Sequence, residues 1–479
     1  MSLTSATNVA SSALLSRQSQ MEVITSNVAN SDNKNYHLRK ATLQSINIGT
    51  LGTGVYVSSV TRSYDAALEE SLRDSTSSYN YQSSYNSKIS DIETVLGPNA
   101  KNPLNESVVE FADALQNLTT SSDSSTARSA LINSANNLSS TLNSSYSSLA
   151  SLRDTIANND VNGNGLLSTE IDELNNLVEN LITLNETIFT LENGNFSKQQ
   201  ALDLRDERDA IVKDISKYVD INVNEEPNTQ YTVELNLASG TVTLVDGTVF
   251  PSLGANSLEL VMDDTDGDGI YSTLIHFNDA VAGTSTQIDL ADESGSIQAL
   301  VDSRDYMCEV MEDLYNYTVS FANAINTAQA AGFDLNDDVG AALFSVPAAQ
   351  PASGNIMGVI ISDPNKIAAA SVTGQSGNGT NALNMWKDIN GNVIYNGKSL
   401  LLYSDQILSD VSLEVSNSAR LAETAETVKT MYEKAVSAVS GISMDEEMVN
   451  MLEVQRAYQA ASKMVTVIDE MIESVIQMA

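Results

Sequence analysis

The sequence predicts a mainly α protein, an elongated helical bundle with paired N- and C-terminal coiled-coil helices and a smaller β-rich insertion. Three observations support this prediction. Apolar residues recur at heptad spacing at both chain ends, most of the middle has helical periodicity with few loops, and the pattern changes to strand-like alternation near residue 222. Two amphipathic terminal helices are most stable when paired, so the chain is expected to close on itself.

The terminal helices are expected to provide the surfaces for pairing and for assembly. Small or apolar residues recur by steps of three and four between Leu3 and Val28, and again between Val454 and Met478. A second row on the last helix comprises Met451, Tyr458, Val465 and Ile472. We expect the first seam to pair within the chain and the second row to meet neighbouring subunits. The residues assigned to the assembly interface are Leu3, Leu14, Met21, Ile24, Val28, Met451, Val454, Tyr458, Met464, Val465, Ile468, Met471, Ile472 and Val475.

The first half of the chain is expected to be helical apart from one extended arm. An asparagine-rich cluster at 27–35 ends the first helix, and glycines followed by alternating valines up to residue 60 predict a strand or arm. A helix then runs from about Tyr64 to Leu96, where Gly97 and Pro98 stop it. Further apolar seams predict helices that include residues 108–118, 131–156, 168–191 and 198–219.

The second half mixes strand and helix signals. Tyr231–Leu237 alternates apolar and polar residues, and a second alternating run follows Gly240, which predicts a hairpin. Helical periodicity returns at Ile297, and a helix from about Asp405 leads into the terminal helix. The expected division is a terminal coiled-coil domain (1–35 and 441–479), an elongated helical domain (36–221, 295–331 and 404–440), a β-rich outer insertion (222–294) and a mixed, irregular, β-containing segment (332–403).

Composition argues against several classes of function. The chain has 62 acidic and 24 basic residues, a net charge of −38, so it offers no basic stripe for nucleic acid or for an anionic membrane. One cysteine, Cys308, excludes an intrachain disulfide, and two histidines, His37 and His276, offer little material for a zinc site or a catalytic triad. We therefore expect no enzyme and no cofactor.

Two acidic loops resemble the first half of a calcium-binding loop. Asp264, Asp266 and Asp268 alternate before Gly269, but position 12, which normally supplies a bidentate carboxylate, is Ile275. A second half-match begins at Asp160 and has the same defect, with Ile171 at position 12. We therefore assign no metal ligands, and the alternative of an acidic, calcium-binding surface protein or an enzyme is weak.

Three acidic residues, Asp445, Glu446 and Glu447, precede the last helix. They complement the helix dipole, and Ser443 with Glu446 forms a capping-box pattern, so a structural role is expected rather than a catalytic one.

The chain start has neither the basic nor the apolar region of a signal peptide, and no apolar run is long enough to span a bilayer. We expect a soluble protein that is cytoplasmic or exported without a cleaved signal.

The terminal motifs resemble those of the bacterial flagellar rod, hook and hook-associated proteins. The similar stretches are Val23–Asn30 at the start, and Ser440–Asn450, Gln455–Ser462 and Ile468–Met471 at the end. Internal stretches at 202–219, 300–336 and 363–383 are similar to hook-associated members of this family. The turn after the first helix departs from the family's usual Thr-Pro-Gly-Tyr because it reads Asn33-Lys34-Asn35-Tyr36, and Gln329 replaces a common histidine.

The resemblance implies a structural protein at the junction between hook and filament. About eleven copies would form a closed ring, with the terminal helices as its inner layer and the middle of the chain facing outward. It further implies export through the flagellar type III channel, an export chaperone on the C-terminal helix, contacts with the hook protein and a second junction protein, and an extracellular location. The alternative within the family is another axial protein, such as a hook, rod or second junction protein.

Overall fold

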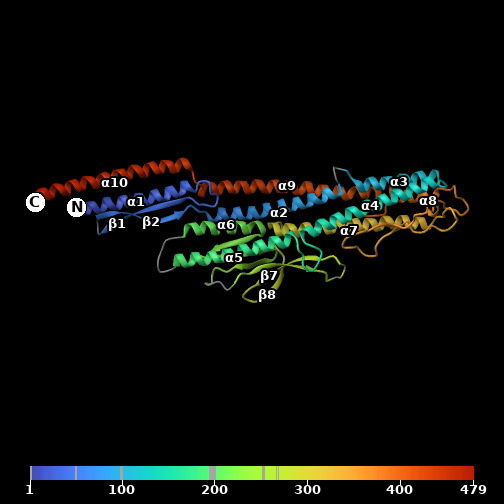
Figure 1. Ribbon diagram of the computed structural model, residues 1–479, viewed down its shortest axis with the longest axis horizontal. Coiled ribbons are helices and arrows are strands. Elements are labelled where there is room, and N and C mark those ends of the chain that lie inside the picture. Colours follow the sequence, from blue (N-terminus) through green and yellow to red (C-terminus); the bar gives the residue numbers. More distant parts are fainter. Residues whose placement is uncertain are drawn as a thin grey trace.

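The computed structural model describes residues 3–48, 51–97, 101–193, 201–250, 254–265, 267 and 269–478. Helices dominate these residues, and the molecule is elongated (Figure 1). The helices are α1 (Leu3–Ala29), α2 (Ala66–Leu96), α3 (Pro103–Thr120), α4 (Ser125–Ile156), α5 (Leu166–Asn193), α6 (Leu202–Tyr218), α7 (Gly295–Ala330), α8 (Thr380–Asn390), α9 (Leu400–Ser440), α10 (Met444–Met478) and the short η2 (Pro364–Lys366). This confirms the predicted mainly α class with its smaller β portion.

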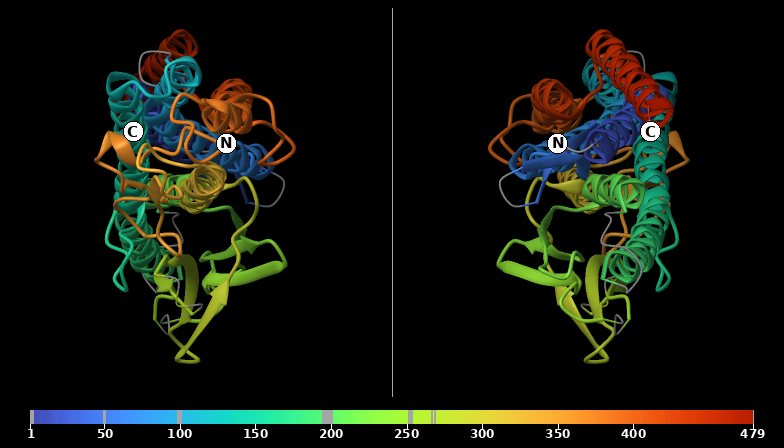
Figure 2. Two further views of the ribbon diagram at one scale, coloured as in Figure 1. Left: turned by 90° about the vertical axis from the view of Figure 1, so that its right-hand side faces the viewer. Right: turned by 90° about the vertical axis from the view of Figure 1, so that its left-hand side faces the viewer.

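The strands form small antiparallel sheets. The predicted arm after α1 is a hairpin of β1 (Arg39–Ile48) and β2 (Leu51–Arg62). The region predicted to be β-rich contains two three-stranded meanders, which splay apart in Figure 2. Their strands are β3 (Ile221–Glu225), β4 (Tyr231–Leu237), β5 (Gly240–Val245), β6 (Ser257–Asp263), β7 (Ser272–Asp279) and β8 (Thr284–Ile288), and a two-residue pair joins β9 (Phe344–Ser345) to β10 (Gly358–Val359).

One continuous hydrophobic core extends through the helical body. It runs from Ile89 of α2 to Val411 of α9 and takes in α3, α4, α5, α7 and the inner faces of both meanders. Because the meanders share this core, the β-rich region is packed onto the body. The division of the chain into domains stays a prediction.

The segment 332–403 contains a helix that was not expected from the sequence. Its α8 buries Ala382, Met385 and Ile389 and packs against α3 and α7. The helix is short and lies between glycine-rich loops, so its apolar spacing is too brief to establish a period. The rest of the segment is irregular, apart from the two-residue strands, η2 and the start of α9 at Leu400.

The two chain ends form a separate layer at one end of the molecule (Figure 1). Helix α10 packs along α1, and α1 packs on the hairpin. The buried residues of this layer, among them Ala10, Ile24, Val454 and Ile468, lie outside the large core. The terminal layer therefore has a small core of its own, as the heptad patterns at both ends predict.

Candidate assembly site at the paired chain ends

The contact between α1 and α10 follows a heptad line on α10. Val454, Ala461 and Ile468 are spaced by seven residues and are at most 8% exposed. On α1, Ala10 and Ile24 are buried, whereas Leu14, Met21 and Val28 are half-buried. The side chain of Leu3 lies outside the described residues. Knobs at seven-residue spacing are typical of coiled-coil packing, in agreement with the predicted pairing.

The two flanks of this line differ in solvent exposure. The flank that we expected to be exposed is mostly half-buried, and the flank that we expected to be buried is exposed. Met451, Val465 and Ile472, expected to face neighbours, are half-buried, and only Tyr458 of that row is exposed, at 43%. Three residues of the expected internal seam are instead 46–52% exposed, namely Met464, Met471 and Val475. Both flanks share the line through Val454, so heptad spacing alone cannot decide which flank faces α1.

A buried polar network closes the pair where α10 begins. The Asn27 amide donates to Glu447 Oε2 at 2.8 Å and to the Arg39 carbonyl at 2.9 Å. Its oxygen accepts from the Arg39 N–H at 3.1 Å and from the Tyr36 hydroxyl at 3.0 Å. Asn27 is 1% exposed and Glu447 is 5% exposed. One side chain of α1 thus holds the turn before β1 and the first turns of α10 together.

Glu447 has a different role from the one expected of it. We interpreted Asp445, Glu446 and Glu447 as acids that complement the helix dipole. Ser443 Oγ does accept from the Glu446 N–H at 3.4 Å, but Glu447 points inward to Asn27. The sequence contained a signal for this role, because Glu447 lies seven residues before Val454, at a seam position. A charged residue at such a position indicates a buried partner.

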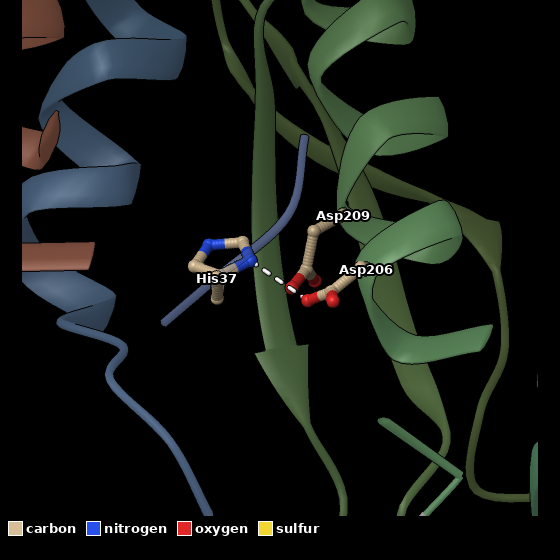
Figure 3. A group of neighbouring side chains, drawn as sticks. All are labelled: His37, Asp206 and Asp209. Carbon is tan, nitrogen blue, oxygen red and sulfur yellow. Dashed lines mark hydrogen bonds and ion pairs between the residues drawn. The ribbon is translucent and has the colours of Figure 1, made fainter. Parts of the chain in front are cut away.

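A second network ties the hairpin to the helical body (Figure 3). His37 Nδ1 lies 2.8 Å from Asp206 Oδ1 of α6, and Figure 3 shows the ring pointing at that carboxylate. Arg62, the last residue of β2, donates to Asp206 at 2.8 Å and to Asp209 at 2.6 Å. The Arg39 guanidinium reaches the other oxygen of Asp206 at 3.1 Å. The sequence did not lead us to expect this network, which joins α6 to residues more than 100 positions earlier in the chain.

The pKa of His37 reflects this environment. Burial disfavours the imidazolium, but the carboxylates of Asp206 and Glu69 favour it more strongly and raise the pKa to about 9. Burial likewise opposes the charge on Asp206, yet hydrogen bonds from His37 and Arg62 hold the pKa of that carboxyl below its usual range. At neutral pH this network therefore holds a charged histidine between acidic partners.

The same three side chains could, by type, hold a metal ion. Ligand atoms of His37, Asp206 and Asp209 lie within 4.8 Å of one another. However, the Arg62 guanidinium already bridges the two carboxylates, and Arg39 occupies the remaining Asp206 oxygen. A metal would have to displace both cations, so the residues fit an ion-pair network and not a metal site.

In the described part of the two calcium half-motifs, the first aspartate of each accepts hydrogen bonds from the backbone of its own loop. The Asp160 carboxylate accepts from the Asn162 and Gly163 N–H groups at 2.8 and 3.1 Å, which makes it a turn-forming group. Asp266 and Asp268 lie outside the described residues. Both residues at position 12, Ile171 and Ile275, are buried in the core.

The fold is an elongated helical body with a separate layer of paired terminal helices. Three family models match the chain, and they describe the same class. A model for the flagellar hook-associated protein FlgK helical domain matches residues 89–344, and models for basal body rod proteins match the ends, at 8–36 and 433–478. The first covers more than half of the chain, so the chain belongs to the FlgK family of flagellar hook-associated proteins.

Curated relatives and a solved structure agree with this family. The chain is 26% identical to flagellar hook-associated protein 1 of Bacillus subtilis over 97% of this chain and 96% of that protein. It is 26% identical to the protein of the same name from Salmonella typhimurium, over 72% of this chain and 60% of that protein. The flagellar hook junction protein FlgK from Burkholderia pseudomallei has the same fold, with a TM-score of 0.63, 13% identity, and coverage of 78% of this chain and 100% of that one.

These findings establish the chain as a structural component of the bacterial flagellum. The match to the FlgK helical domain separates it from the other axial proteins, which we considered as the alternative. Its family is an axial flagellar family whose members assemble with themselves and with other flagellar proteins, and it is not known for enzymatic activity. None of the described helices is long and apolar enough to cross a membrane.

Proposed function

We propose that this chain forms the junction between hook and filament, and that copies join through the exposed flank of α10. One observation carries the proposal: α10 is paired with α1, yet Met464, Val467 and Met471 remain 46–52% exposed along one side. Apolar surface of this kind on a soluble protein marks an interaction site. Covering each half-exposed side chain would contribute about 1 kcal/mol at the interface that buries it.

The proposed assembly is a closed ring of about eleven copies, with the terminal layer inside and the helical body outside. It contacts the hook protein on one side and a second junction protein on the other. The family's flagellar location supports an extracellular position. Electron cryomicroscopy of the hook–filament boundary would count the copies and show which end of the molecule faces each neighbour.

We further propose export through the flagellar type III channel without a cleaved signal, with a chaperone on α10 before export. The exposed methionines support this, because such a surface is an aggregation hazard in the cytoplasm. Deleting the last 30 residues should leave a soluble chain that neither binds the chaperone nor joins hook to filament. Normal swimming by cells with this deletion would contradict the proposal.

The interface itself can be tested with a double substitution. Met464→Ser with Met471→Ser should leave the helix content and the thermal midpoint of the monomer unchanged, because neither side chain is buried. Cells with this variant should shed their filaments and lose motility. The matched control is Gln455→Ser with Gln459→Ser, which changes two exposed polar positions of the same helix. Full motility of the methionine variant would refute the assignment of this flank.

A further inference from the structure

A groove that is open to solvent lies between the terminal layer and the helical body. It has a volume of about 650 Å³ and lies between α1, the hairpin, the end of α5 and the start of α6. Apolar side chains of its lining include Val23, Val57, Val60, Leu191, Leu202 and Leu204. Leu191 is 49% exposed, so apolar surface at the groove is open to solvent.

The charges at this groove are mainly acidic. Glu22 of α1 and Asp203 of α6 line it, and both are exposed, the Asp203 side chain at 85%. Arg39 also lines it, but its guanidinium is already bonded to Asp203 and Asp206. The groove thus combines apolar walls with two exposed acids, of which Asp203 is already paired with Arg39 and Glu22 accepts, among the described residues, only from Gln18.

The exposed flank of α10 has the complementary character. Between Glu453 and Asp469 the only charged residues are Arg456 and Lys463, and both are exposed. At about 100° per residue they lie within about 40° of Val467 around the helix, on the side away from α1, and Met464 and Met471 lie about 40–60° beyond Val467. In a chain with 62 acidic and 24 basic residues, a patch that is both apolar and basic is uncommon.

The two surfaces lie on opposite sides of α1. Figures 1 and 2 show α10 on one side of α1, and the hairpin and α6 on the other. They therefore cannot meet within one chain while α10 stays on α1. A patch and a groove on opposite sides of one molecule produce a head-to-tail contact, which builds rings or helical arrays.

We propose that the Arg456–Met471 face of α10 docks into the acidic, apolar groove of the adjacent copy of this chain. This inference rests on the proposed function and adds the acceptor surface to it. The methionines are suited to such a contact, because they adapt to an apolar wall of irregular shape. Arg456 and Lys463 lie at the rim of the patch, where they meet Glu22 and Asp203 and orient the two copies.

Site-specific photo-crosslinking in cells tests this contact directly. A benzophenone amino acid replaces Val467, and in a second strain Met471, so that two registers along α10 are sampled. Flagella are sheared from illuminated cells, and crosslinked peptides are identified by mass spectrometry. The control probe replaces Gln455, which is exposed but lies about 120° around the helix from Val467.

The expected result is a ladder of covalent oligomers in which the Val467 or Met471 probe joins peptides of α1, β2 or the α5–α6 region, while the Gln455 probe does not. If flagella carry filaments but the crosslinks from both probes map elsewhere, the groove is not the acceptor surface. The proposed function would then remain intact. Failure of the unmodified chain to appear at the hook–filament boundary would instead overturn the proposed function. Crosslinks to the groove from the Gln455 probe alone would also reject this face of α10.

Discussion

Replacing Asn27 with alanine should loosen the terminal pair more than any other single polar substitution in it. The Asn27 side chain makes four hydrogen bonds, one of them to the buried carboxylate of Glu447. Three neutral bonds at about 1 kcal/mol and one charged bond at about 2 kcal/mol give about 5 kcal/mol. Water entering the cavity would recover part of this, so we expect a loss of about 3–4 kcal/mol.

Native-state hydrogen exchange measures this loss locally. The Arg39 N–H, which donates to Asn27, and the first turns of α10 should exchange faster. A loss of about 3 kcal/mol corresponds to roughly a hundredfold acceleration. Amides in α4 and α7 belong to the large core and should be unaffected.

Asn30→Ala is the matched control. Asn30 lies one turn further along, and its amide makes a single local bond to the Ser26 carbonyl at 2.9 Å. Its replacement should change exchange in α10 by less than about tenfold, since it has no bond to α10. Equal effects of Asn27→Ala and Asn30→Ala, or no effect of either, would refute the view that Asn27 links the two chain ends.

Three further outcomes are expected. The pKa of His37 in the folded chain is raised to about 9, so its charge contributes about 3 kcal/mol to the free energy of unfolding. This contribution is complete below pH 6.5 and is lost as the pH rises through 9. The thermal midpoint should therefore fall across that pH range, and His37→Gln should abolish the fall. Ile468→Ala should destabilise the terminal pair by about 2–3 kcal/mol, whereas Met471→Ser should not, as exchange in α10 would report. Calorimetry with millimolar Ca²⁺ should give no heat, and Asp160→Asn should behave like the unaltered chain; a saturable signal would revive the calcium loop.

The helices and their pairing could be predicted because they depend on local pattern. The seam through Val454, Ala461 and Ile468 is visible as a seven-residue repeat, and the asparagine-rich turn marks the end of α1. The side of α10 that faces α1 could not be predicted. Two flanks share that seam, and the choice depends on where α1 and the hairpin sit in space.

The two polar networks could not be predicted from local sequence patterns for another reason. His37 and Asp206 are 169 residues apart, and Asn27 and Glu447 are 420 apart. Charged residues usually face solvent, so Asp206 in a helix and Arg62 at a strand end look like ordinary surface residues in the sequence. Only the return of the chain to the hairpin brings them together.

The separation of Asn27 from Glu447 also constrains the order in which the molecule folds. Closing a loop of 420 residues is entropically costly, but the helical body shortens it. Ser63 Oγ donates to the Val439 carbonyl at 2.9 Å, and the Leu38 N–H donates to the Ser440 carbonyl at 2.8 Å. These bonds join the two segments of the chain where they leave the body. The remaining loop, from 27 to 38 and from 440 to 447, is roughly 18 residues.

The difference, (3/2)RT ln(420/18), is about 3 kcal/mol. A folded body therefore lowers the entropic cost of closing the terminal pair, so we expect the pair to form after the body has folded. A chain that is cut short, or whose body is misfolded, has no complete terminal layer to offer a neighbour. We therefore expect the connectivity of the chain to exclude incomplete subunits from the proposed assembly.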